Sequence, residues 1–197
     1  IFDGQQPGDI KYLDVSGEDG KPDGKITTDD RVIRGNDQPK LNYFANLSLN
    51  YKKWSFEVLF QGVTGVDAYY SGPYAYGLNM TGDGSTPMKA QLDYWTPENT
   101  NASYPRLAPS SSYGNNHHTS DFWHFDASYC RVKYIQVGYT FDQMSLKKVG
   151  VSSIRLYLNA QNPFTFAKQD LVDPEARGQK GSYPLVKTYS VGASLNF

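Results

Sequence analysis

Residues 43–61 read YFANLSLNYKKWSFEVLFQ, and this stretch decides the fold class. Apolar and polar residues alternate with a period of two on both sides of Lys52 and Lys53. Such alternation is typical of a β-strand with one apolar face, because successive side chains of a strand point to opposite sides. Two such segments joined by a two-residue turn predict an antiparallel hairpin.

The same period of two recurs in three further segments of the chain. Each predicted strand has about nine to eleven residues, which is long enough to cross an outer membrane at a tilt. Short connections follow the strands at one end and long connections at the other, a difference that is typical of transmembrane β-barrels. Aromatic residues also gather near the short turns, as in the girdle of such a barrel. The predicted strands are 43–51, 54–62, 131–141, 152–161 and 188–197.

An antiparallel β-sandwich is the alternative that periodicity leaves open. Its strands alternate in the same way, with the apolar face turned inward against a second sheet. Both architectures are all-β and antiparallel, so alternation by itself does not say which way the apolar face points.

Charge and cysteine content exclude several classes of function. The 197 residues include 19 Lys and Arg against 20 Asp and Glu, so the net charge is −1. Nonspecific binding of nucleic acid needs clustered positive charge, so we expect this chain not to bind nucleic acid. Cys130 is the single cysteine, so neither an internal disulfide nor a multi-thiolate metal site can form.

An acidic stretch between residues 14 and 30 predicts a metal site. Its order of oxygen-bearing residues, followed by a glycine, an aliphatic residue and a closing carboxylate, is similar to an EF-hand calcium loop. We therefore expect calcium, with a solvated acidic turn as the alternative reading. The candidate ligands are Asp14, Ser16, Asp19, Asp23, Lys25 (through its carbonyl) and Asp30.

Histidines do not indicate an enzyme. His117 and His118 are adjacent, and no carboxylate stands at a recognisable metal-ligand spacing from them or from His124. We predict that the chain has no catalytic residues.

Six sequence elements, taken in order, resemble the C-terminal part of SusC/RagA-type TonB-dependent outer-membrane receptors of Bacteroidetes. Together they cover nearly the whole chain. They are residues 7–12 (PGDIKY) with 30–31 (DR) and 35–36 (GN), 60–62 (FQG), 94–99 (YWTPEN), 104–107 (YPRL), 126–133 (DASYCRVK) with 138–140 (GYT), and 160–165 (AQNPFT) with 173–175 (DPE).

The resemblance implies part of a transmembrane β-barrel with long extracellular loops. Residues 1–40 would then form an extracellular segment holding the acidic turn, and 41–197 the barrel strands and their loops. The resemblance also implies an orientation for each face of the strands. Tyr43, Leu47, Phe56, Ile135, Leu156 and Val191 would face lipid, and Asn46, Ser48, Glu57, Gln136, Arg155 and Asn196 would face the lumen.

The function implied by the resemblance is import of oligosaccharides or peptides across the bacterial outer membrane. The implied partners are a SusD-like lipoprotein, the lipid bilayer, the plug and remaining barrel strands of the receptor, and TonB through an N-terminal part outside this sequence. Candidate contacts with cargo or lipoprotein are Tyr69, Tyr70, Tyr74, Tyr76, Trp95 and Trp123. The alternative function is a secreted, calcium-stabilised β-sandwich that binds carbohydrate, which would be a water-soluble monomer.

Overall fold

The computed structural model describes residues 5–70, 88–107, 114–142, 150–177, 183 and 185–197. They fall into two compact units. One unit contains the described residues of Ile1–Asp37, Asp67–Phe125 and Ala176–Ser182. The other contains those of Gln38–Val66, Asp126–Glu175 and Tyr183–Phe197. Tyr74 and Tyr76 lie outside the described residues.

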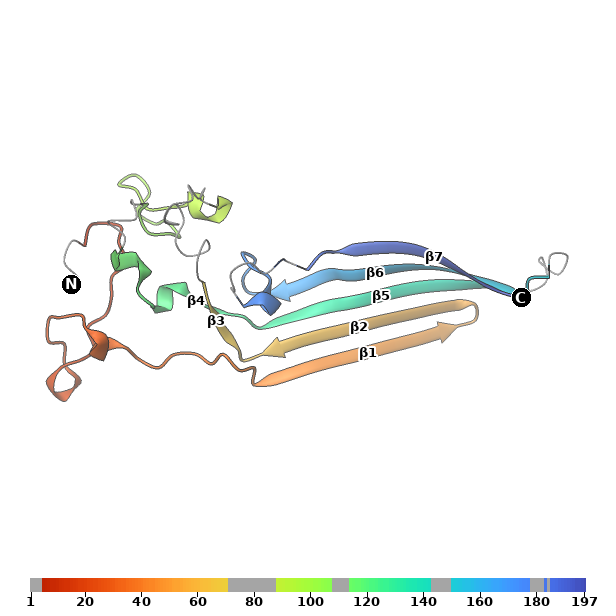
Figure 1. The fold of residues 1–197 in the computed structure, drawn as a ribbon, viewed down its shortest axis with the longest axis horizontal. Helices are drawn as coiled ribbons and strands as arrows, with labels where there is room; N and C mark the ends of the chain where they lie inside the picture. The colour runs from red at the N-terminus through yellow and green to blue at the C-terminus, as the bar shows by residue number, and fades with distance from the viewer. Residues whose placement is uncertain (1–4, 71–87, 108–113, 143–149, 178–182, 184) are drawn as a thin grey trace. The chain divides into compact units, whose positions relative to one another are not determined.

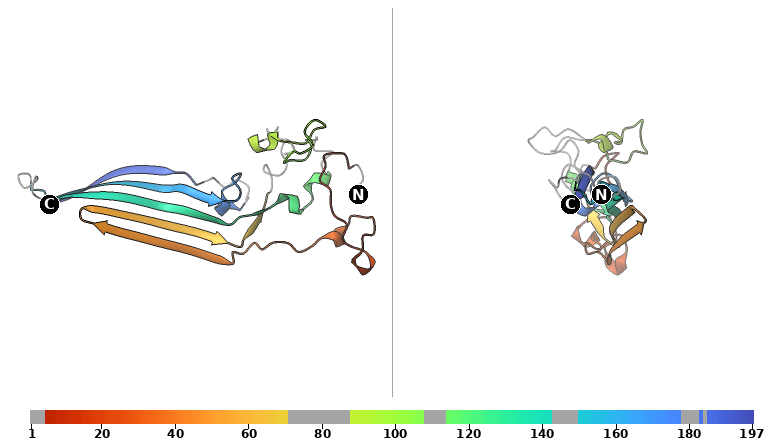
Figure 2. Two further views of the ribbon diagram at one scale, coloured as in Figure 1. Left: turned by 180° about the vertical axis from the view of Figure 1, so that it is seen from behind. Right: turned by 90° about the vertical axis from the view of Figure 1, so that its right-hand side faces the viewer.

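The second unit is built on a five-stranded antiparallel sheet, as the sequence predicted (Figure 1). Its strands lie in the order β1-β2-β5-β6-β7, and Figure 1 and the left view of Figure 2 show them side by side. Neighbours in the sheet follow one another in the order of the chain, and all four pairings are antiparallel. The strands are β1 (Leu41–Tyr51), β2 (Trp54–Thr64), β5 (Tyr129–Asp142), β6 (Ser153–Ala167) and β7 (Thr188–Asn196).

The register places apolar side chains on one face of all five strands. A single row across the sheet contains Leu49, Phe56, Val137, Leu158 and Val191. The adjacent row, on the opposite face, contains Ser48, Glu57, Gln136, Asn159 and Ser190. Because a slip of one residue in any pairing would exchange the faces of a strand, this agreement fixes the register.

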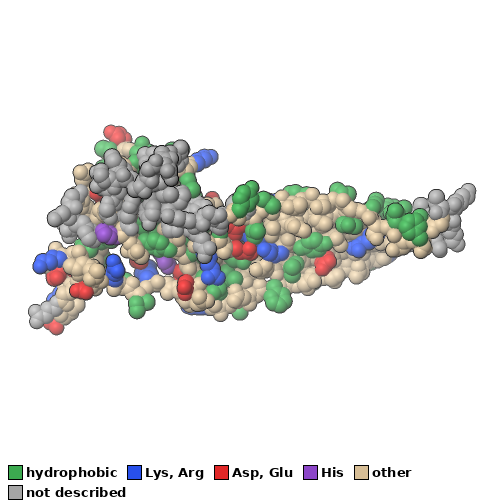
Figure 3. All heavy atoms as spheres, viewed as in Figure 1, with side chains coloured by type: hydrophobic (Ala, Val, Ile, Leu, Met, Phe, Trp, Pro, Cys, Tyr) green, Lys and Arg blue, Asp and Glu red, His purple; other side chains and the backbone are tan. Residues whose placement is uncertain are grey.

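The apolar face is open. Leu158 is 59% exposed and Val191 is 80% exposed, and Figure 3 shows hydrophobic side chains standing at the surface along the strands. The only other sheet among the described residues has two short strands, β3 (Asp67–Tyr69) and β4 (His124–Asp126). A sandwich needs a second sheet of comparable size over this face, so the structure contradicts the sandwich alternative.

Two bulges interrupt the sheet near the end where the long connections begin. In the β2–β5 pair, Lys133 is an extra residue of β5. In the β5–β6 pair, two residues of β6, Asn162 and Pro163, lie opposite Lys133. Asn162 has a φ of +50°, a conformation that asparagine tolerates better than most residues. Proline has no backbone N–H to donate to a neighbouring strand. A bulge accommodates it because the residues of a bulge do not all take part in strand pairing. β6 therefore continues to Ala167, beyond the end expected at residue 161.

The first unit has little regular structure beyond β3 and β4. Its core is made by Ile10 and Trp123, with tyrosines packed around them. Every described helix is a short 3-10 turn, and none is long and apolar enough to cross a membrane. These turns are η1 (Glu18–Gly20), η2 (Thr28–Asp30), η4 (Lys89–Leu92), η6 (Gly114–His117) and η7 (Asp121–Trp123), with η10 (Pro174–Ala176) at the boundary between the units.

Candidate functional site

A cluster of charged side chains lies on the polar face of the sheet, where β5 begins. We call it the Arg131 cluster; its members are Tyr129, Arg131, Lys133, Asp173 and Glu175. The Arg131 Nη2 donates to Asp173 Oδ1 at 2.9 Å, and its Nη1 lies 3.3 Å from Glu175 Oε1. The guanidinium therefore bridges two carboxylates of the segment that follows β6.

Further bonds hold the same two carboxylates. Lys133 Nζ lies 3.1 Å from Glu175 Oε1, and the Tyr129 hydroxyl donates to that oxygen at 2.9 Å. The backbone N–H of Leu185 donates to Asp173 Oδ2 at 3.2 Å. Two cations and a hydroxyl of the strand thus meet two anions of one short loop.

The geometry follows from the pleat of β5. Residues at i, i+2 and i+4 of a strand share a face, so Tyr129, Arg131 and Lys133 point to the same side. The Arg131 Nε also donates to Thr165 Oγ1 of β6 at 2.8 Å, which fixes the plane of the guanidinium. The rigid fork of the guanidinium lets Arg131 donate hydrogen bonds to Thr165 and Asp173, while its Nη1 forms an ion pair with Glu175.

The central ion pair of the cluster, between Arg131 and Asp173, is buried. The Arg131 side chain is 3% exposed and that of Asp173 is 9% exposed. Burial acts to raise the pKa of Asp173, but hydrogen bonds from Arg131 and from the backbone N–H groups of Glu175 and Leu185 outweigh it, so this pKa lies below its usual value. Asp173 is therefore an anion at neutral pH.

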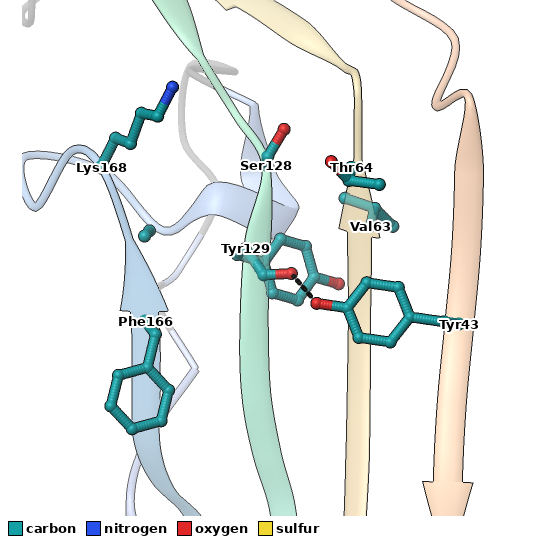
Figure 4. A pocket seen from close by; sticks show the side chains of 8 residues that line it. Tyr43, Val63, Thr64, Ser128, Tyr129, Phe166 and Lys168 are labelled. Atoms are coloured by element: carbon teal, nitrogen blue, oxygen red, sulfur yellow. Dashed lines mark hydrogen bonds between the residues drawn. The ribbon is translucent and has the colours of Figure 1, made fainter.

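The apolar face carries an open depression at the same end of the sheet (Figure 4). The ring of Tyr43 crosses Gly62, and its hydroxyl donates to the Tyr129 carbonyl at 3.3 Å. A Cβ at Gly62 would lie 2.4 Å from that ring, so only glycine fits there. The lining residues are Tyr43, Val63, Thr64, Ser128, Tyr129, Phe166, Ala167 and Lys168.

Lys168 is paired at the rim of this depression. Its Nζ lies 2.7 Å from Asp126 Oδ2, and the hydrogen bonds of Asp126 with Lys168 and Ser128 lower its pKa to about 2. The depression is apolar along the strands and polar at its rim.

The predicted aromatic contacts that are described all lie in the first unit. Trp123 is 2% exposed, and its indole N–H donates to the Asn116 carbonyl at 2.9 Å. Tyr69 and Tyr70 pack around it, and Tyr70 also stacks on Phe125 with ring centroids 4.3 Å apart. These three aromatics therefore supply packing, and their contact with cargo or lipoprotein stays a prediction.

Trp95 lies over Gly8, where a Cβ would come within 2.3 Å of the indole. Gly8 also has a φ of +87°, which favours glycine on its own account. Next to Gly8, Asp9 forms a bidentate ion pair with Arg106, with Nε–Oδ1 at 2.6 Å and Nη2–Oδ2 at 3.2 Å. Residues 7–9 and 104–107, two elements of the family resemblance, therefore meet in space.

The acidic loop folds around its own carboxylates. Asp30 accepts N–H bonds from Val15, Ser16 and Thr27 through its two oxygens. Asp14 accepts from the N–H groups of residues 23 and 24. Backbone hydrogen bonds, first of all that from Thr27, hold the pKa of Asp30 well below its ordinary value. The candidate ligands thus come from one closed loop.

The remaining candidate ligands lie along the same loop. Asp23 accepts from the Lys25 N–H at 2.8 Å, and Asp19 lies in η1 with a φ of +62°. Among the residues that the structure describes, no three His, Cys, Asp or Glu side chains are grouped so as to hold a metal ion. Calcium binding at the loop stays a prediction.

Sequence reasoning did not single out the Arg131 cluster as a site. Both of its halves belong to elements of the family resemblance, residues 126–133 and 173–175, which the sequence does not connect. A signal was available in their opposite charge, because basic residues at the start of one strand and acidic residues just after its neighbour fall at the same end of a sheet.

The comparisons with known proteins agree with the fold. No protein-family model matches the chain. It is 30% identical to TonB-dependent receptors P3 and P26 of Formosa agariphila, over 97% and 100% of its length. It is 26% identical to TonB-dependent receptor SusC of Bacteroides thetaiotaomicron over 94%. It spans about a fifth of the length of these relatives, from 19% to 20%.

Solved structures show the same fold. The RagAB peptide transporter matches with a TM-score of 0.71 at 24% identity, covering 93% of this chain and 20% of the other. The RagAB peptide importer in its open-open state matches with a TM-score of 0.69 over the same shares.

The fold and the relatives together define the class. The chain belongs to the TonB-dependent receptors. Within that class it is similar to SusC, and its fold is similar to that of the RagAB structures, in agreement with the resemblance carried by its six sequence elements. The named relatives are receptors and transporters rather than enzymes.

Proposed function

We propose that this chain forms part of the barrel wall and loops of an outer-membrane transporter that imports oligosaccharides or peptides. The observation that carries the proposal is the open apolar face. Large apolar side chains repeat along all five strands without a described layer above them. In water, so large a patch would drive association, whereas the hydrocarbon of a bilayer is its natural solvent.

The proposed orientation follows from the two ends of the sheet. The end with the short Lys52–Lys53 turn would face the periplasm, and the end with the long connections would face the outside. Aromatic rings at the turn end support this orientation. Trp54 packs edge-to-face on Tyr139 with centroids 4.8 Å apart, and Tyr51 is paired with Trp54. Such rings sit at the level of lipid headgroups.

The proposed partners are a SusD-like lipoprotein on the outside and TonB on the periplasmic side. The resemblance to SusC/RagA-type receptors supports the lipoprotein, and the similarity to the RagAB peptide importer supports a peptide as one class of cargo. The loops of the first unit would meet it, and the half-buried rings of Tyr69, Tyr70 and Trp95 are the proposed contact surface. We assign this chain no catalytic role.

Deletion of the gene for the full-length receptor tests the proposal. We expect the strain to lose growth on one class of oligosaccharides or peptides as sole nutrient. Growth on the corresponding monosaccharides or amino acids should continue, because porins admit small solutes. A plasmid copy should restore growth only in cells with active TonB. Equal growth of the deletion and parent strains on every oligomer tested would contradict the proposal.

A further inference from the structure

The loop after β6 is held by charge rather than by apolar packing. The described segment from Lys168 to Glu175 leaves the sheet and returns to its polar face, where Asp173 and Glu175 meet Arg131. Under the proposed function, on which this inference rests, that face lines the lumen. Apolar anchors there would be exposed to water whenever the loop moved away, and ionic anchors avoid this cost.

The anchoring is redundant on the carboxylate side. Glu175 receives Arg131, Lys133 and the Tyr129 hydroxyl, and Asp173 receives Arg131 with two backbone N–H groups. Arg131 is the one member that contacts both carboxylates. The loop is also braced from within, because Gln169 exchanges two hydrogen bonds with Val172.

A buried ion pair often adds little stability compared with apolar residues of the same size, but it does specify one arrangement. The barrel wall itself does not need the cluster, because its strands are joined by backbone ladders that run on both sides of the two bulges. The ionic contacts therefore determine where the loop lies, whereas the hydrogen bonds between strands stabilise the wall.

We propose that Arg131 is a positioning residue that fixes the Lys168–Glu175 loop against the lumen-facing wall, at the mouth of the transporter. This loop is then a static part of the mouth. Arg131 acts through Asp173 and Glu175 and contacts no cargo in this role.

Spin labelling of the full-length receptor tests the proposal. The label is placed at Asp170→Cys, an exposed position of the loop, in a Cys130→Ser background. Arg131→Gln should raise the ratio of mobile to immobile label by about tenfold or more, because it removes the shared cation of both carboxylates and at least one charge-assisted hydrogen bond. Arg131→Lys should recover part of the immobile signal, because one ammonium can serve only one carboxylate well.

Arg155→Gln is the matched control. Arg155 lies in β6, on the same polar face of the sheet as Arg131. It donates to Ser55 Oγ at 2.9 Å, away from the loop, so its loss should leave the label immobile. The temperature at which the folded gel band is lost should be the same for both variants. An immobile label in Arg131→Gln would overturn the positioning role, and so would a mobile label accompanied by a fall in that temperature relative to Arg155→Gln. Neither readout depends on transport, so the result stands apart from the growth test.

Discussion

Arginine substitution on adjacent rows of β7 distinguishes the two faces of the sheet. Val191 belongs to the apolar row and pairs with Leu158, whereas Ser190 belongs to the polar row. Leu158 is five positions from Ser153 at the turn end, which is about 17 Å along a strand at about 3.3 Å per residue. At a tilt of about 45° this is about 12 Å in depth, the middle of an apolar band about 25 Å tall.

Val191→Arg therefore places a cation near the midplane, where the cost is about 2–4 kcal/mol. That cost lowers the equilibrium constant for folding by about 30- to 700-fold. Ser190→Arg places the same side chain one residue away on the lumen face, where we expect almost no cost. Both variants are compared by urea-dependent folding of the full-length receptor into lipid vesicles, scored by the folded gel band. Equal destabilisation by the two substitutions would refute the assigned faces.

Three further predictions concern the first unit and its acidic loop. Arg106→Met should cost about 3 kcal/mol, because it leaves the Asp9 carboxylate, 1% exposed, without its cation; faster amide exchange in residues 5–12 is the readout, and unchanged exchange would contradict it. The depressed pKa of Asp30 stabilises the loop at neutral pH, and this contribution should fade as the pH falls below about 4; exchange corrected for its intrinsic pH dependence should then rise at Val15 but not in β5. If the acidic loop binds calcium, elemental analysis should find the metal in the receptor and lose it after Asp23→Ala with Asp30→Ala, whereas an unchanged calcium content would remove the assignment.

The strands and their faces could be predicted because the cause is local. The pleat sends alternate side chains to opposite sides, so the row of Leu49, Phe56 and Val137 is visible in the order of residues alone. The direction of the apolar face was not visible, since a sandwich has the same alternation. The family resemblance settled it, and the exposed row in the structure agrees.

The end of β6 and the contacts within the first unit could not be predicted in this way. Asn162 with Pro163 reads as a break, and only the bulge opposite Lys133 lets the strand continue. Asp9 and Arg106 are 97 residues apart in sequence. No periodicity links residues at that distance, and ion pairs leave no pattern when their partners lie in irregular segments.

The central claim is that the apolar face of the sheet meets lipid. Its most direct test is the collision rate of single nitroxides at Val137→Cys and Gln136→Cys, neighbours on opposite faces of β5, in a Cys130→Ser receptor in membranes. We predict that the label at position 137 collides with oxygen, which concentrates in hydrocarbon, and the label at 136 with a water-soluble nickel chelate. Access of the nickel chelate to both positions, or the reverse pattern, would contradict the account.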